Sequence, residues 1–286
     1  MFERISRTTP TAIWFADTRL IVELAEKQIK MFQRPLHAIF TLVASMAITS
    51  CTIITGDGPV VEKTIELEPF HSVHVDGSFD VEINQAAVQN VVVATQENIM
   101  ERFKMSVMDG VLYLSIEPGT YLSYDLTVKL AMPTVSSIEL DGSGDVKIGT
   151  FVGLQDLSIK LDGSGDVKGT GAVEVLSEAT IDLQGSGDIE LKLKAKAVEL
   201  ILDGSGDLEV SGQTNRLIAS LNGSGDIDAA DLKSIDCEVD VNGSGSAKVY
   251  ASEKLKATLQ GSGDIRYDGK PDVEAKIDGS GTIQAD

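Results

Sequence analysis

The sequence predicts an all-β protein built as a single-stranded, right-handed parallel β-helix, a β-solenoid with coils of about 20 residues. Two observations carry this fold class. The tripeptide Gly-Ser-Gly recurs eight times at intervals of 18 to 22 residues, and apolar residues alternate with polar ones on both sides of it. The copies begin at Gly142, Gly163, Gly185, Gly204, Gly223, Gly243, Gly261 and Gly279.

The residues around each copy predict two β-strands joined by a glycine corner. The positions two and four residues before the first Gly, and four residues after it, are apolar in every copy, as in Ile138, Leu140 and Val146. Strict alternation indicates strands with one buried face, and glycine permits the tight bend between them. One unit cannot bury this face alone, so the units must stack. A β-propeller is the rival fold, but its blades need about 40 residues.

Residues 63–135 are predicted to form the N-terminal cap and irregular first coils of the same body, and residues 136–286 its regular coils. Alternating apolar residues run through a degenerate corner, Gly77-Ser78-Phe79-Asp80, and Asp109-Gly110 is typical of a hairpin turn. Terminal units of solenoids are usually atypical because they close the open core.

A lipoprotein signal peptide is predicted over residues 31–50. Arg34 precedes an apolar run of 13 residues, Leu36–Ile48, and small residues follow it. The run is too short to span a bilayer, which takes about 20 residues. The sequence Ile48-Thr49-Ser50-Cys51 resembles the lipobox of bacterial lipoproteins. This resemblance implies that Cys51 becomes the lipidated first residue, with residues 51–62 as a linker.

Residues 1–30 do not fit this layout, because a signal peptide normally begins close to its basic residue. We expect translation to start at Met31, so that the leading segment is not part of the protein. The alternative is a cytoplasmic extension followed by the apolar run as a membrane anchor. Thr52 after the lipidated Cys is compatible with attachment to the outer membrane.

Composition argues against several classes of function. The chain has 44 acidic and 24 basic residues and a net charge of −20, so electrostatics disfavour a nucleic-acid partner. Two Cys cannot build a disulfide framework, and three His show no metal-type spacing. Cys237 occupies a position that other copies fill with aliphatic residues, which predicts a core filler. The repeated Asp residues have no singular catalytic constellation beside them, so we expect no enzyme.

An Asp follows most corners, and stacking would align these carboxylates in a ladder, with Ser246 and Thr282 at two of the positions. Like charges about 5 Å apart repel one another. Two solutions are open: each carboxylate accepts N–H bonds from its own corner, as in an Asx turn, or the ladder binds Ca²⁺. No other cofactor is expected. The candidate Ca²⁺ ligands are Asp145, Asp166, Asp188, Asp207 and Asp226.

The order of motifs resembles the bacterial head GIN domain family, in a lipoprotein form. The resemblance rests on Phe70–Gln85, Asp109–Leu114, a strand that ends at Pro133, and the serial Gly-Ser-Gly-Asp. It covers about residues 65–285 and implies a β-helical, exported and often lipid-anchored protein. The family's description as an auto-transporter adhesin is itself an inference and supplies no biochemical activity.

The sequence therefore predicts an exported lipoprotein of the cell envelope, anchored in the outer membrane, with a non-catalytic, adhesin-like binding domain. The expected partners are the membrane, through the lipid anchor, and a surface glycan or an envelope protein. One alternative is a structural scaffold of the envelope that self-assembles end to end through its edge strands. A carbohydrate-active β-helix enzyme is the other alternative.

Overall fold

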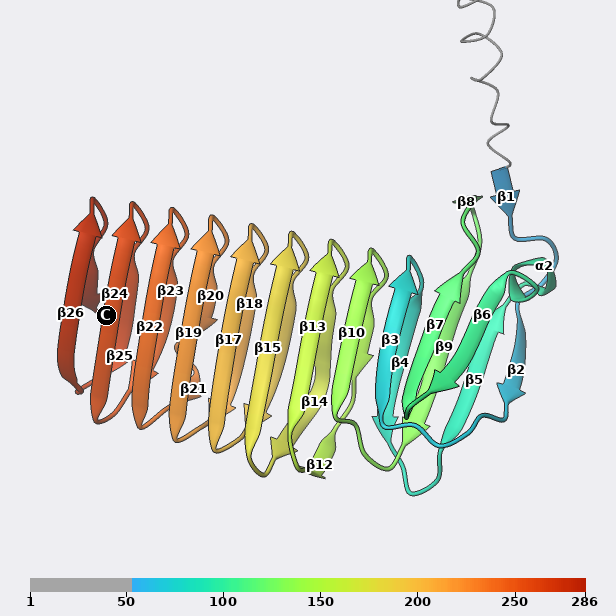
Figure 1. Ribbon diagram of the computed structural model, residues 1–286, viewed down its shortest axis with the longest axis horizontal. Coiled ribbons are helices and arrows are strands. Elements are labelled where there is room, and N and C mark those ends of the chain that lie inside the picture. The colour runs from blue at the N-terminus through green and yellow to red at the C-terminus, as the bar shows by residue number, and fades with distance from the viewer. Residues whose placement is uncertain (1–52) are drawn as a thin grey trace, which may run out of the picture. The chain divides into compact units, whose positions relative to one another are not determined.

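The computed structural model describes residues 53–286, which form one elongated body (Figure 1). Successive coils lie side by side along it, and each regular coil contributes strands to two parallel sheets that face each other. The β-solenoid predicted from the repeat is confirmed. Residues 1–30, the predicted signal peptide and Cys51 lie outside the described residues.

Within residues 53–286, two large sheets and a small ribbon contain all the strands. The first sheet has eleven strands, in spatial order β26 (Asp272–Gly279), β24 (Lys254–Gly261), β22 (Asp236–Gly243), β19 (Arg216–Gly223), β17 (Ala197–Gly204), β15 (Glu178–Gly185), β13 (Leu157–Gly163), β10 (Ser137–Gly142), β3 (Ser72–Gly77), β7 (Val111–Ile116) and β6 (Phe103–Met108). The second has fourteen: β2 (Val61–Ile65), β5 (Asn90–Thr95), β9 (Leu126–Met132), β4 (Asp80–Gln85), β11 (Val146–Ile148), β14 (Val167–Val175), β16 (Ile189–Lys194), β18 (Leu208–Gln213), β20 (Ile227–Ala229), β23 (Ala247–Ala251), β25 (Ile265–Gly269) and β27 (Ile283–Ala285), with β12 (Phe151–Leu154) beside β14 and β21 (Leu232–Lys233) beside β18. The ribbon pairs β1 (Ile53–Thr55) with β8 (Thr120–Leu122).

Helix contributes little to residues 53–286. A single short helix, α2 (Glu97–Met100), lies in the cap. No helix in this part of the chain is long and apolar enough to cross a membrane.

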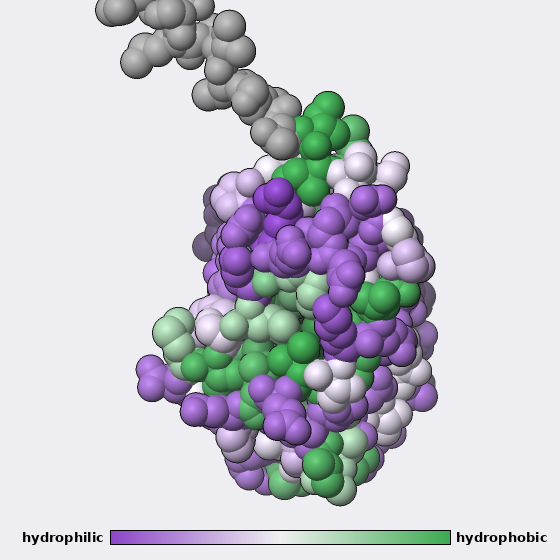
Figure 2. Space-filling view, turned by 90° about the vertical axis from the view of Figure 1, so that its right-hand side faces the viewer, coloured by the Kyte–Doolittle hydropathy of each residue, from purple (hydrophilic) through white to green (hydrophobic). Residues whose placement is uncertain are grey.

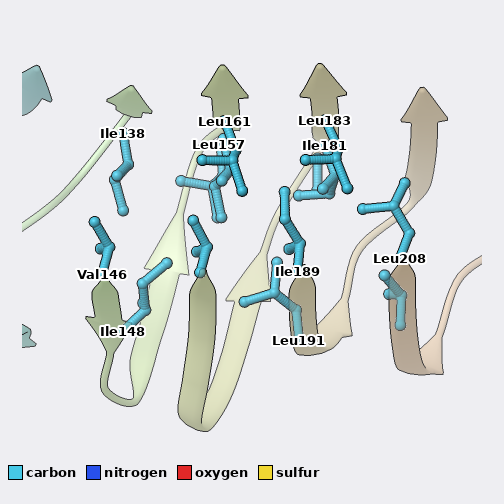
Figure 3. Close-up of a cluster of buried hydrophobic side chains, with 14 of the residues drawn as sticks. Ile138, Val146, Ile148, Leu157, Leu161, Ile181, Leu183, Ile189, Leu191 and Leu208 are labelled. Atoms are coloured by element: carbon cyan, nitrogen blue, oxygen red, sulfur yellow. The ribbon is translucent and has the colours of Figure 1, made fainter. Parts of the chain in front are cut away.

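Aliphatic side chains fill the space between the two large sheets in stacked rows (Figure 3). Ile138, Ile159, Ile181 and Leu200 are partners in successive strands of one such row, and all four are fully buried. Because the parallel pairing is in register, each row repeats one position of the sequence unit. The apolar face that a single unit cannot bury is therefore covered by its neighbours.

The glycine corners stack on one another where the first sheet passes into the second. Gly142 pairs with Gly163, which has a φ of +147°. A Cβ on Gly163 would lie 2.1 Å from the carbonyl oxygen of Gly142, and a Cβ on Gly165 would lie 1.9 Å from that of Gly144. Both places need glycine, because any side chain would prevent the corners from stacking at the spacing of the strands.

The spatial order of the coils departs from chain order at the N-terminal end. The coil of β3 and β4 lies between the coil of β7 and β9 and the coil of β10 and β11. The chain therefore leaves β4, builds the cap, returns through β7 and β9, and crosses to β10 on the far side of β3 (Figure 1). Sequence alternation does not reveal this order, because it identifies a buried face without naming the neighbouring strand.

Antiparallel strands close the N-terminal end, where the sequence predicts a cap. β2 pairs with β5, β5 with β9, and β6 with β7 in antiparallel fashion. Asp109 and Gly110, with φ of 53° and 77°, form the β6–β7 hairpin as predicted. Figure 2 shows this end, where hydrophilic residues surround a group of apolar ones. Ile65 of β2 and Met105 and Val107 of β6 are only partly buried.

Short strands also occur in the segment that the sequence predicts as a linker, residues 51–62. β1 lies within it, and β2 begins at Val61. A strand of three residues is too short for an alternating pattern to appear in the sequence.

Candidate functional site

The carboxylates that follow the glycine corners form a hydrogen-bonded ladder between coils. The backbone N–H of the residue at this position donates to Oδ1 of the Asp at the same position of the preceding coil. The N···Oδ1 distances are 3.3 Å for Asp145 to Asp80, 3.1 Å for Asp166 to Asp145, 3.1 Å for Asp188 to Asp166, 3.0 Å for Asp207 to Asp188, 3.0 Å for Asp226 to Asp207, and 2.8 Å for Ser246 to Asp226.

The acceptor role of these carboxylates resembles that in an Asx turn, but the donor belongs to the next coil and not to the residue's own corner. At the far end of the ladder, Thr282 donates both its N–H and its Oγ1–H to Oδ1 of Asp264, each at 2.8 Å. These two hydrogen bonds lower the pKa of Asp264. The ladder therefore contributes bonds along the solenoid, in addition to those of the sheets.

No three of the five candidate Ca²⁺ ligands, all among the described residues, lie close enough together to hold one ion. Within residues 53–286, one set of three His, Cys, Asp or Glu side chains places a potential ligand atom from each within 4.8 Å of the others, and it consists of His74, Glu139 and Asp141. Ca²⁺ takes six to eight oxygen ligands, so a site on the ladder would need further oxygens. Ca²⁺ binding by Asp145, Asp166, Asp188, Asp207 and Asp226 stays a prediction.

A groove of about 540 Å³ lies on the edge of the body opposite the glycine corners, where strands of the second sheet turn into strands of the first. This edge is the lower one in Figure 1. The groove crosses the turns of five successive coils. Its lining residues are Val175, Leu176, Lys194, Ala195, Lys196, Gln213, Thr214, Asn215, Lys233, Ser234, Ile235, Tyr250 and Ser252.

The groove collects basic and hydrogen-bonding groups in an otherwise acidic protein. Lys194, Lys196 and Lys233 line it, together with hydroxyl and amide side chains, and no Asp or Glu does. The ammonium nitrogen of Lys233 lies 4.4 Å from the centroid of the Tyr250 ring, within the range of a cation–π contact. The groove therefore offers positive charge, an aromatic ring and neutral hydrogen-bonding partners along one line.

Two of these lysines have acidic partners outside the groove. Lys194 Nζ lies 3.3 Å from Glu174, and Lys233 Nζ lies 3.6 Å from Asp231. All four side chains are largely exposed, and exposed pairs of this kind contribute about 1 kcal/mol or less. A ligand with its own negative charge can therefore compete for both ammonium groups.

Hydrogen bonds to the backbone hold the floor of the groove. Thr214, 5% exposed, directs its hydroxyl to the carbonyl oxygens of Lys196 and Arg216, at 3.2 and 3.0 Å. Ser234, 2% exposed, donates to the carbonyl oxygen of Tyr250. The turns are thus fixed before any ligand arrives, which lowers the entropic cost of binding.

The repeated motif does not reveal this groove, because the groove residues occupy turns of unequal length that carry no repeated motif. The feature of the sequence that could have revealed the groove is the position of these residues relative to the predicted strands. Lys194, Lys196, Lys233 and Tyr250 all fall at or near the end of a second-sheet strand, in three of the five neighbouring units. Such positions must come together once the units stack.

Other chemically reactive side chains have structural surroundings. Cys237 is buried in the core as the repeat predicts, and burial raises the pKa of its thiol to about 12. His71 Nδ1 lies 2.9 Å from Ser136 Oγ and 3.2 Å from Ser72 Oγ. Among the described residues no carboxylate pairs with the His71 ring, as a Ser-His-Asp triad would require.

Comparisons with known proteins give a consistent picture. A family model described as "Putative auto-transporter adhesin, head GIN domain" matches residues 69–271. A comparison with curated proteins found no match.

Solved structures share the fold. A protein of Parabacteroides distasonis described as a "putative adhesin" is 26% identical, with a TM-score of 0.73 over 82% of this chain and 100% of that one. Another from the same organism, described as a "putative lipid binding protein", is 25% identical, with a TM-score of 0.71 over the same shares. A "putative adhesin" of Parabacteroides merdae, 23% identical with a TM-score of 0.74 over 82% of this chain and 99% of that one, shows the fold alone.

Proposed function

The chain belongs to the head GIN domain family, and from this premise we propose that it is an exported cell-envelope lipoprotein whose solenoid binds an anionic glycan without catalysing a reaction. Related proteins are described as a "putative adhesin" and a "putative lipid binding protein", and those descriptions favour a surface location and a binding role. The groove that Lys194, Lys196 and Lys233 line is the observation that carries the ligand class.

The lipid anchor is proposed for Cys51, the last residue of the lipobox-like sequence. β1 begins two residues later, at Ile53, so the anchor would attach at the capped end of the solenoid. Stable attachment takes more than one acyl chain. Mass spectrometry of the native protein would find an N-terminal peptide that begins at a diacylglycerol-modified Cys51. An unmodified Cys51 within a longer peptide would contradict the anchor.

An extended polyanion suits the groove better than a small molecule does. Five coils at a spacing of about 4.8 Å extend over roughly 20 Å, so a polymer can contact the same kind of turn several times. Ammonium groups form strong, charge-assisted hydrogen bonds with carboxylates or sulfates, and Tyr250 can pack against a sugar ring. The whole chain carries a net charge of −20, which repels polyanions, so binding is local to the groove and weakens with salt.

The composition of the groove favours binding without catalysis. Glycan cleavage by hydrolases uses a pair of Asp or Glu residues that flank the scissile bond, and the groove is lined by none. Its lysines can neutralise a uronate, but the groove offers no carboxylate pair to hydrolyse the glycosidic bond. We therefore propose that the bound glycan is released without being cleaved.

Binding to polygalacturonate, an acidic polysaccharide, tests the proposal, with neutral dextran as the comparison. The double variant Lys196→Gln/Lys233→Gln should bind polygalacturonate at least tenfold more weakly, because it removes two charge-assisted contacts. Lys147→Gln/Lys168→Gln is the matched control, since these two lysines are exposed partners on neighbouring β11 and β14, outside the groove. Equal loss in both variants, or equal binding of dextran, would contradict the proposal.

A further inference from the structure

Two neighbouring strands of the first sheet, β3 and β10, bring a histidine and two carboxylates together on its outer face. His74 on β3 is the ladder partner of Glu139 on β10, and Asp141 lies two residues further along β10. Tyr113 on β7 is the partner of His74 on the other side. These residues are distant in the sequence and meet only because the chain crosses from the cap to β10.

Both ring nitrogens of His74 face a carboxylate. Nδ1 lies 2.9 Å from Oε2 of Glu139, and Nε2 lies 3.4 Å from Oδ2 of Asp141. The ring packs against Tyr113 with its centroid 5.4 Å away, which fixes the ring plane. The side chains of His74, Glu139 and Asp141 are 23%, 34% and 40% exposed, so the cluster is accessible yet partly withdrawn from solvent.

The two His74 contacts differ in kind. A distance of 2.9 Å is that of a good hydrogen bond, whereas 3.4 Å exceeds the usual range for an N–H donor and an oxygen. Two ligands of a tetrahedral Zn²⁺, each about 2.0–2.1 Å from the metal, lie about 3.3–3.4 Å apart. The gap between Nε2 and Asp141 is therefore the width of a metal–ligand edge.

We propose that His74, Glu139 and Asp141 form a binding site for Zn²⁺. One potential ligand atom from each lies within 4.8 Å of the others, and imidazole with carboxylates is a ligand set that Zn²⁺ accepts. The metal joins β3 to β10, the strands between which the chain crosses over. It therefore stabilises the junction between the cap and the regular coils.

Lys160 on β13 lies beside this site. Its ammonium nitrogen is 3.5 Å from Oε1 of Glu139, so it competes with a cation for that carboxylate. Removing this charge strengthens Zn²⁺ binding, whereas a purely structural role of the cluster gives no such gain. The substitution Lys160→Gln therefore separates the two roles.

Calorimetric titration of the metal-stripped full-length protein with ZnCl₂ tests the site. The wild type binds one Zn²⁺ at this cluster; His74→Ala and Asp141→Asn lose at least tenfold in affinity, and Lys160→Gln gains. His71→Ala is the control, because His71 contacts serines and no carboxylate of the described residues. Wild-type affinity in His74→Ala, equal loss in His71→Ala, or no Zn²⁺ binding at all would overturn the proposal.

Thermal melts with and without Zn²⁺ distinguish the loss of metal binding from a general loss of stability in a variant. In EDTA, Asp141→Asn should melt close to the wild type, because it keeps the shape of the side chain. Zn²⁺ raises the melting temperature of the wild type and of His71→Ala, but not of Asp141→Asn. A Zn²⁺-dependent shift of equal size in all three proteins would place the metal elsewhere.

Discussion

Single residues of the corner have separate tasks. The two glycines allow the backbones of adjacent coils to approach each other, and the Asp that follows supplies an acceptor for the next coil. Gly165 has no positive φ, so its constraint is steric alone, whereas Gly153 has a φ of +74° and open space around a Cβ. Substitutions at Gly165 and at Gly153 therefore measure two effects separately: steric crowding at Gly165 and backbone conformation at Gly153.

Replacing Gly165 with Ala should destabilise the protein strongly. The new Cβ would lie 1.9 Å from the carbonyl oxygen of Gly144, and the backbone at that distance must shift, at a cost of about 3 kcal/mol or more. Gly153→Ala should cost only about 1 kcal/mol, for the strained φ. Urea unfolding measures both, and a smaller loss for Gly165→Ala than for Gly153→Ala would contradict the close stacking.

Removing one carboxylate from the ladder should have a modest effect. Asp188 Oδ1 accepts the N–H of Asp207 at 3.0 Å, so Asp188→Ala should lower the free energy of unfolding by about 1 kcal/mol. Asp188→Asn keeps an acceptor oxygen and should stay close to the wild type. Melts in calcium and in chelator test the Ca²⁺ prediction, which fails if the wild-type midpoint is the same in both.

The buried thiol of Cys237 gives stability a dependence on alkaline pH. The thiol of the unfolded chain loses its proton above about pH 8.5, whereas burial holds that of the folded state until about pH 12. Below pH 8.5 both states are protonated and stability is complete; above it the unfolded state is favoured progressively. Urea unfolding of the wild type and Cys237→Val should therefore diverge from pH 8.5 upward, and parallel curves would contradict this.

At the scale of the elements, one corner departs from the repeated Gly-Ser-Gly sequence. The second Gly of the corner is Phe79 in the coil of β3 and β4, and its ring is buried in an edge-to-face contact with Phe103 of β6, with centroids 5.2 Å apart. The next coil outward, β7 to β9, connects its strands through a longer excursion that contains β8. The stack of corners starts at the coil of β3 and β4, with no corner beyond it, so the side chain of Phe79 fits at this position.

Restoring the consensus at this position should therefore harm the protein. Phe79→Gly removes a buried aromatic side chain from the contact between the first corner and the cap, at a cost of about 3–5 kcal/mol. Gly144 stacks on the backbone of Phe79 and not on its ring, so the regular coils should keep their circular dichroism. Increased stability of Phe79→Gly would show that the sequence unit, and not the cap, decides this position.

Sequence predicts the regular coils well because each position recurs in every copy. Ile138, Leu140 and Val146 are buried where the alternation places them. The order of the first coils could not be predicted, since β3 and β7 have equally apolar faces and pairing depends on the crossover. The groove could have been found from the strand-end positions of its lysines, but the His74 cluster could not, because it depends on the crossover that places β3 beside β10.

At the scale of the whole molecule, the repeated architecture and the candidate binding groove are separate features. The stacked apolar rows and glycine corners recur along the body, so they supply rigidity without marking a place for a ligand. The groove is local and irregular, with Lys194, Lys196 and Lys233 on one edge of a protein with a net charge of −20. A ligand that prefers this edge must therefore be recognised by charge.

Lysine footprinting by mass spectrometry tests the central claim, that an anionic glycan binds this groove. The protein is acetylated with and without polygalacturonate, and the modification of each lysine is compared. We expect protection of Lys194, Lys196 and Lys233, with Lys147, Lys168 and Lys248 unchanged on the exposed face of the second sheet. Uniform protection, or protection confined to the sheet face, would contradict the groove as the binding site.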